Sequence, residues 1–172
     1  MDWRPDLFCL LLALSAPAGL ADAVPEGLEG RSVTFNILTY DHPELPLFDG
    51  KRHPAIVGDG VEFGLGPEGA QNGIDVVPVQ IDVSARRIEF SYAATLPGGF
   101  MAAEFNGYVL RFPTECVLLT GAALVPEGTT LGLKPEDLRV EPQALYLNVA
   151  GLTFDREDRI TVAVDVMDCP IG

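Results

Sequence analysis

The feature that most constrains this chain is an alternation of apolar and polar residues that recurs in five separate runs. In the first run, Val33, Phe35 and Ile37 alternate with polar residues. The other four runs cover residues 77–83, 87–92, 145–149 and 160–166. Successive side chains of a strand point to opposite faces of the sheet, so each run predicts an antiparallel strand with one buried face.

Further strands complete the pattern. Residues 105–112 are apolar on both faces, which predicts a strand in the middle of a sheet. Weaker strands are expected at residues 55–57, 61–65, 117–119 and 138–141. Gly and Pro recur between the runs, as in Pro126-Glu127-Gly128, and no window of ten residues has a helical pattern. We therefore predict an all-β fold: one antiparallel β-sandwich or jelly roll over residues 24–172.

The first 23 residues have the layout of a secretory signal peptide. Residues 7–14 are apolar, Pro17 and Gly19 follow, and Ala21 and Ala23 supply the small residues that a signal peptidase needs. A membrane anchor is the alternative, but it needs roughly 20 apolar residues, and Pro17 interrupts this shorter run. We expect an N-terminal signal helix over residues 1–23 and a periplasmic or secreted mature domain without a membrane span.

The charge of the chain disfavours two classes of partner. The chain has 25 acidic and 11 basic residues, a net charge of −14 at pH 7. Such a surface repels phosphate backbones and anionic lipids, so nucleic acids and membrane surfaces are not expected as partners. Cleavage of the signal peptide would also remove Trp3, the only tryptophan, which excludes a carbohydrate platform of stacked indoles.

The same cleavage would remove Cys9 and leave Cys116 and Cys169. In an oxidising compartment this pair predicts a disulfide. It would close a loop of roughly 54 residues and contribute about 4 kcal/mol on the chain-entropy model. Two buried free thiols are the alternative, whereas a metal site is disfavoured because the sequence has no CxxC and no histidine near either cysteine.

Three acidic connections, at residues 40–49, 58–63 and 155–158, are candidates for binding a cation. Calcium takes six to eight oxygen ligands, commonly carboxylates along one loop together with backbone carbonyls. None of the three connections has EF-hand spacing, so either two of them converge on one calcium ion or all are solvated turns. The candidate ligands are Asp41, Asp49, Asp59, Glu62, Asp155 and Asp158.

No catalytic residue is assigned from the sequence. His42 and His53 could form a zinc or acid–base pair, but each precedes a proline, which favours an extended or turn conformation in an exposed loop. A pair of carboxylates could serve glycoside hydrolysis, but with so many acids a suitable spacing is expected by chance.

Three segments carry a family resemblance. They are residues 55–63 (AIVGDGVEF), 105–108 (FNGY) and 144–154 (ALYLNVAGLTF). Together they resemble segments of small secreted β-sandwich proteins of Gram-negative bacteria, many of which have a PEP-CTERM or VPLPA sorting tail. The resemblance extends over about residues 31–166 and lies in the pattern of strands and turns. It implies export and a sandwich fold, and brings no catalytic residues. No apolar tail follows Cys169, so we expect a freely soluble form.

Three functions are compatible with these observations. The favoured hypothesis is a non-enzymatic binding or interaction module for a protein or an extracellular polymer. A structural or matrix component that self-associates through its sheet edges is the second. The third is a small hydrolase or lyase with a site built from carboxylates.

Overall fold

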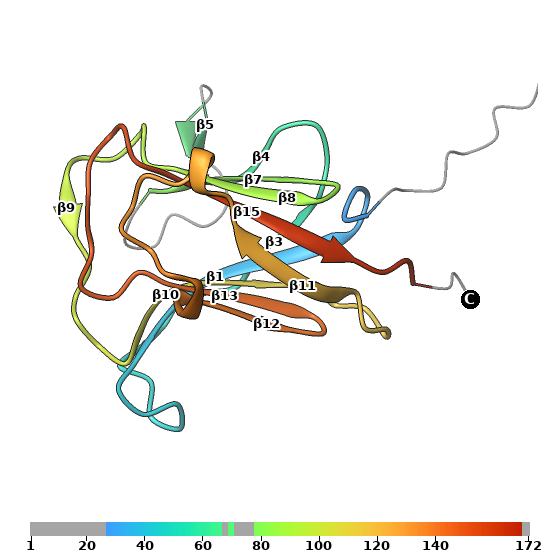
Figure 1. The fold of residues 1–172 in the computed structure, drawn as a ribbon, viewed down its shortest axis with the longest axis horizontal. Coiled ribbons are helices and arrows are strands. Elements are labelled where there is room, and N and C mark those ends of the chain that lie inside the picture. Colours follow the sequence, from blue (N-terminus) through green and yellow to red (C-terminus); the bar gives the residue numbers. More distant parts are fainter. Residues whose placement is uncertain (1–26, 67–68, 71–77, 170–172) are drawn as a thin grey trace, which may run out of the picture.

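The computed structural model describes residues 27–66, 69–70 and 78–169, and the predicted signal peptide lies outside them. Two antiparallel sheets pack face to face, which confirms the predicted all-β sandwich (Figure 1). Among the described residues, the helices are two single 3-10 turns, η1 (Pro126–Gly128) and η2 (Pro135–Asp137).

The first sheet has six strands. Its order is β12 (Leu138–Glu141), β13 (Ala144–Asn148), β10 (Phe105–Arg111), β1 (Ser32–Tyr40) and β2 (Phe48–Asp49), and β3 (His53–Ile56) also pairs with β1. β10 is central, between β1 and β13, and residues 105–110 are all buried. This confirms the prediction made from its apolar residues on both faces.

The second sheet has five strands. Its order is β11 (Leu119–Leu124), β15 (Arg159–Val166), β8 (Arg87–Ser91), β7 (Gln80–Ser84) and β4 (Val61–Phe63). Two short pairs complete the fold: β9 (Gly98–Gly99) with β14 (Thr153–Phe154), and β5 (Leu65–Gly66) with β6 (Gly69–Ala70). Figure 1 shows β9 across one end of the two layers.

The run predicted at residues 61–65 is divided between β4 and β5, and the bounds of β11 differ most from the prediction. The weak run at residues 117–119 becomes a strand only from Leu119, and β11 continues to Leu124. Its Gly121, Ala122 and Ala123 have low intrinsic strand preference, so the alternation is hard to see in the sequence. Pairing with β15 forms the strand, and its other side lies beside β12, at the edge where the two sheets approach.

The core between the sheets is rich in aromatic rings. Phe35 lies 5.3 Å from Phe63 and 6.0 Å from Tyr108, between ring centroids, and Phe90 stacks on Tyr108 at 5.4 Å. All four rings are buried. They come from both sheets, so this contact fixes how the sheets pack on each other.

Asn36 is the exception to the alternation in β1, because it faces away from the core and is nevertheless completely buried. Its side-chain amide donates to Asp49 Oδ1 at 2.9 Å, and its carbonyl accepts from Arg111 Nη1 at 2.6 Å. A buried polar group needs such partners, so this network stabilises the outer face of the first sheet.

Candidate functional site

The acidic candidates lie apart in the structure. Asp41 follows β1, and its Oδ1 accepts from the backbone N–H of Glu104 at 3.2 Å. Asp49 ends β2 and holds the side chain of Asn36. Both carboxylates therefore connect neighbouring parts of the first sheet.

Asp59 and Glu62 lie at the opposite end of the sandwich. Glu62 Oε1 accepts from the N–H of Gly58 at 2.9 Å, and Oε2 accepts from the N–H of Val83 at 2.7 Å. Burial raises the pKa of Glu62 above its ordinary value, the two N–H groups partly offset this, and the nearby charge of Asp82 adds to it. Glu62 thus fixes a turn to β7, whereas Asp59 is exposed.

Asp155 and Asp158 lie together in the turn before β15. Asp158 Oδ2 accepts from the N–H of Asp155, and Asp155 Oδ1 accepts from the N–H of Glu157, both at 2.8 Å. Asp158 Oδ1 also accepts from the hydroxyl of Thr130 at 2.6 Å. These bonds are those of an Asx-type turn, in which the carboxylate holds nearby backbone N–H groups.

The connections that contain Asp41 and Asp155 lie at the same end of the sandwich, whereas the one that contains Glu62 lies at the other. Within residues 27–66, 69–70 and 78–169, no three side chains of His, Cys, Asp or Glu are grouped as metal ligands. His42 is exposed in the turn after β1, whereas His53 is the first residue of β3, opposite Phe35. The two histidines are thus on different elements.

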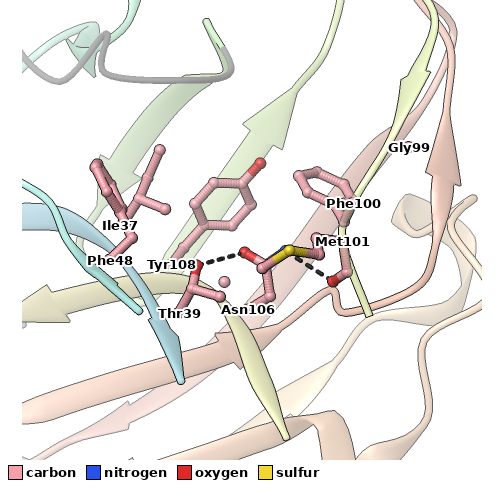
Figure 2. Close-up of a pocket in the computed structure, with 9 residues that line it drawn as sticks. Ile37, Thr39, Phe48, Gly99, Phe100, Met101, Asn106 and Tyr108 are labelled. Carbon is pink, nitrogen blue, oxygen red and sulfur yellow. Dashed lines mark hydrogen bonds between the residues drawn. The ribbon is translucent and has the colours of Figure 1, made fainter. Parts of the chain in front are cut away.

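A partly enclosed hollow lies at the end of the sandwich where β1 finishes and β10 begins; we call it the end pocket (Figure 2). Its volume is about 320 Å³. Ligand pockets in proteins commonly begin at this size. The lining residues are Ile37, Thr39, Phe48, Gly99, Phe100, Met101, Asn106, Gly107 and Tyr108.

Two polar side chains lie among these apolar ones. Thr39 Oγ1 donates to Asn106 Oδ1 at 2.9 Å, and Asn106 Nδ2 donates to the carbonyl of Met101 at 2.9 Å (Figure 2). Thr39 and Asn106 are 4% and 9% exposed. Because these bonds satisfy them, the pocket presents a mainly apolar surface with one polar patch.

Tyr108 connects the pocket to the core. Its ring makes an edge contact with Phe100 at 6.2 Å, and its hydroxyl lies 3.1 Å from the hydroxyl of Tyr92. Burial raises the pKa of both tyrosines well above their ordinary value. Both hydroxyls therefore remain protonated and serve as hydrogen-bonding groups, not as bases.

The wall formed by β9 depends on a close approach. A Cβ atom on Gly98 would lie 2.9 Å from the ring of Phe154, so only glycine lets β9 lie against this ring. Phe154 in turn stacks on Tyr92 at 5.0 Å and contacts Phe100 at 4.8 Å. This stack holds Phe100 at the pocket.

Sequence reasoning did not identify the end pocket. Thr39 offers one signal, because it continues the alternation of Val33, Phe35 and Ile37 and so places a polar side chain on an inward position. Asn106 and Tyr108 lie in the run at residues 105–112, whose apolar character on both faces predicts a central strand and gives no sign of a pocket. The contribution of residues 99–101 depends on β9 crossing the end of the sandwich, which no local pattern indicates.

The predicted disulfide is present. Cys116, after β10, is bonded to Cys169, after β15, with Cα atoms 5.8 Å apart.

Comparison with known proteins finds no matching family model, curated protein or solved structure. In the part of the chain that the structure describes, no helix is long and apolar enough to cross a membrane.

Proposed function

We propose that this protein is a non-enzymatic binding module that takes an apolar side chain of a protein partner into the end pocket. The observation that carries the proposal is the open, mainly apolar cavity of about 320 Å³. A cavity of about 150 Å³ holds a benzene ring, so this volume is sufficient for an indole or phenol side chain. Binding energy at protein interfaces is concentrated in such anchored side chains.

The surroundings of the pocket support a protein partner. Phe48 and Met101, which line it, are 39% and 55% exposed. Leu45, Leu47 and Leu96, in connections at the same end, are 73%, 60% and 73% exposed. Exposed apolar side chains around a concave site are typical of interaction surfaces.

Charge at this end indicates the chemistry of the partner. The connections 41–47, 92–104 and 149–158 contain six acidic and one basic side chain. An acidic rim attracts a basic segment and speeds its association. The proposed partner segment therefore carries an aromatic or long aliphatic residue between lysines or arginines.

The enzyme hypothesis has less support at this pocket. Its lining, among the described residues, contains neither a carboxylate nor an imidazole, so the pocket offers binding groups and no acid–base pair.

The matrix hypothesis requires exposed sheet edges. The edge strands β2 and β4 have only two and three residues, and β11 lies beside β12. Short or covered edges give little surface for strand addition. Neither alternative function is favoured by a specific observation.

We also propose that the protein is exported to the periplasm or the medium. The Cys116–Cys169 disulfide supports this location, because structural disulfides persist in oxidising compartments.

Binding can be tested with a pentapeptide that has one tryptophan between two pairs of lysines. We expect its fluorescence to report saturable binding that weakens with salt. A peptide with alanine in place of tryptophan should bind roughly tenfold or more weakly. A peptide with glutamates in place of lysines should also bind more weakly. Equal binding of all three peptides would disprove the proposal.

Two methionines give a matched pair of variants. Met101→Gln places a neutral polar side chain of similar length at the pocket, and we expect it to weaken binding of the tryptophan peptide several-fold without changing the charge of the rim. Met167→Gln is the control, since Met167 is similarly exposed at 47% and lies near the disulfide. Equal effects of the two substitutions would mean that the peptide binds elsewhere.

A further inference from the structure

A second hollow lies on the outer face of the first sheet, away from the end pocket. Its volume is about 580 Å³, and we call it the arginine cleft. Its lining includes Thr34, Arg52, Arg111, Glu141, Gln143 and Tyr146. The peptide-binding function proposed for the end pocket does not involve this cleft.

The strand register explains why the surface is hollow here. Thr34, Arg111, Ala144 and Glu141 are partners in one row across β1, β10, β13 and β12, so they face the same side of the sheet. Ala144 has the smallest side chain of the row, and the longer Arg111 and Glu141 stand on either side of it. The row therefore forms a floor with raised walls.

Arg111 is held in place from below. Its Nη1 donates to Oδ1 of the completely buried Asn36 at 2.6 Å, and its guanidinium carbon lies 5.7 Å from the centre of the Tyr146 ring. Tyr146 is itself covered by Arg139, whose guanidinium carbon lies 3.8 Å from the ring centre. A guanidinium fixed in this way loses little freedom when it binds a ligand.

The charges in the cleft are not balanced. Arg139 forms an ion pair with Glu141, whereas neither Arg52 nor Arg111 has a carboxylate partner among the described residues. Arg52 and Arg111 both line this one cleft, so their positive charges add there. They are complementary to an anion, and the planar fork of arginine matches a carboxylate.

Neutral polar groups lie beside the two arginines. Gln143 uses its Nε2 to donate to the carbonyls of Thr114 and Cys116, and no hydrogen bond from the described residues reaches its Oε1. The hydroxyl of Thr34 is likewise without a partner among the described residues. A carbonyl and a hydroxyl next to two guanidinium groups suit a ligand with both a carboxylate and hydroxyl groups.

We propose that the arginine cleft binds a sugar acid, with its carboxylate on Arg111 and Arg52 and its hydroxyls on Thr34 and Gln143. The ligand is a hydroxylated monocarboxylate of uronic-acid type. It has a single negative charge for each residue bound, which limits repulsion from the acidic remainder of the protein. The site is independent of the peptide-binding function proposed for the end pocket.

The test is calorimetric titration of the purified protein with glucuronate, glucose, acetate and inorganic phosphate. Glucuronate should bind more tightly than acetate, glucose should show no binding, and affinity for glucuronate should fall with salt. Phosphate binding as tightly as glucuronate, or the absence of glucuronate binding, would overturn the proposal. A further titration with trigalacturonate distinguishes a polymeric ligand from a free sugar acid. If trigalacturonate binds far more tightly than the monomer, the ligand is a polymer of sugar acids. If the two bind equally, the ligand is the free sugar acid.

Variants locate the bound carboxylate. Arg111→Gln and Arg52→Gln should each weaken glucuronate binding roughly tenfold, and Arg111→Lys should restore it only in part. Arg87→Gln is the control, because Arg87 is exposed on β8 of the other sheet and pairs with Glu89. Arg52 is exposed, so its substitution leaves the fold intact even where Arg111→Gln does not. The proposal would be overturned if Arg52→Gln, and Arg111→Gln where it folds, bound glucuronate as tightly as the unsubstituted protein does.

Discussion

At the end of the sandwich that carries the disulfide, Leu28, Val57 and Leu118 are buried beneath the connections, whereas at the pocket end Leu45, Leu96 and Met101 face solvent. The disulfide end also exposes Ile56, Val117 and Met167, by 64%, 46% and 47%. The difference is that the exposed apolar residues of the pocket end surround a cavity.

The two ends also differ in what holds their connections. At the disulfide end, a covalent bond, the two acceptor atoms of Glu62 and a backbone bond from Leu28 to Ala85 fix the loops. At the pocket end, the bonds include one between two side chains that line the cavity, Thr39 and Asn106, and bonds from carboxylates to backbone N–H groups, as at Asp41 and Asp158. The covalent cross-link therefore lies at one end and the exposed apolar cavity at the other, so we expect substitutions at the two ends to have separable effects.

The largest expected effect is that of removing the disulfide. Cys116→Ala combined with Cys169→Ala should lower the free energy of unfolding by about 4 kcal/mol, because the unfolded chain loses a constraint across 53 residues of sequence. The measurement is urea unfolding followed by far-UV circular dichroism. The variant, while folded, should still bind the tryptophan peptide at the pocket end, and loss of that binding would show that the ends are coupled.

A smaller loss is expected for Glu62→Ala. Removal of the carboxylate leaves the backbone N–H groups of Gly58 and Val83 without this acceptor, which should cost about 2–3 kcal/mol. Asp59→Ala, three residues away and exposed, is the matched control and should change stability by less than about 0.5 kcal/mol. Equal unfolding midpoints for the two variants would contradict the role assigned to Glu62.

The tyrosine pair behind the end pocket gives the next effect. Tyr108→Phe leaves the buried hydroxyl of Tyr92 without this partner and should cost about 1–2 kcal/mol. Tyr40→Phe, on the outer face of the first sheet, serves as the control.

The same pair sets a dependence on alkaline pH. Both pKa values are raised on folding, so the associated stability is complete below the unfolded tyrosine pKa of about 10 and is lost as the pH rises above it. The phenolate absorbance of these two tyrosines should therefore appear only with unfolding, and its appearance in folded protein would disprove their burial.

The smallest effect on stability is expected at the exposed leucines. Leu45→Ser together with Leu96→Ser should change the free energy of unfolding by less than about 0.5 kcal/mol, because both side chains are 73% exposed. We expect the same variant to weaken binding of the tryptophan peptide several-fold. Ile56→Ser, at a 64% exposed position on β3, should leave binding unchanged.

Much of the fold could be predicted because the signal is local. Alternation in β1, β8, β13 and β15 follows from one buried face in each strand, and the doubly apolar run at residues 105–112 correctly predicts the central β10. The disulfide followed from an even pair of cysteines in a predicted exported domain. β11 could not be predicted in full, since its small residues are held by pairing with β15.

The candidate sites could not be predicted, because their groups come from distant segments. The acidic residues chosen for their density prove to hold turns or neighbouring side chains, as Glu62 and Asp158 do. The end pocket needs Thr39, Phe100 and Asn106 to meet where β9 crosses the sandwich. The arginine cleft needs the register that places Arg111 beside Ala144.

By itself, the sequence determined the strand-forming segments, their inward faces and the pair of cysteines, because side-chain periodicity and residue type act within a few residues. Only the tertiary structure decided which carboxylates hold turns, where apolar side chains remain exposed, and which arginines lack an ion pair. Those properties depend on strand order and register, and a shift of one residue in register would turn every side chain of a strand to the other face.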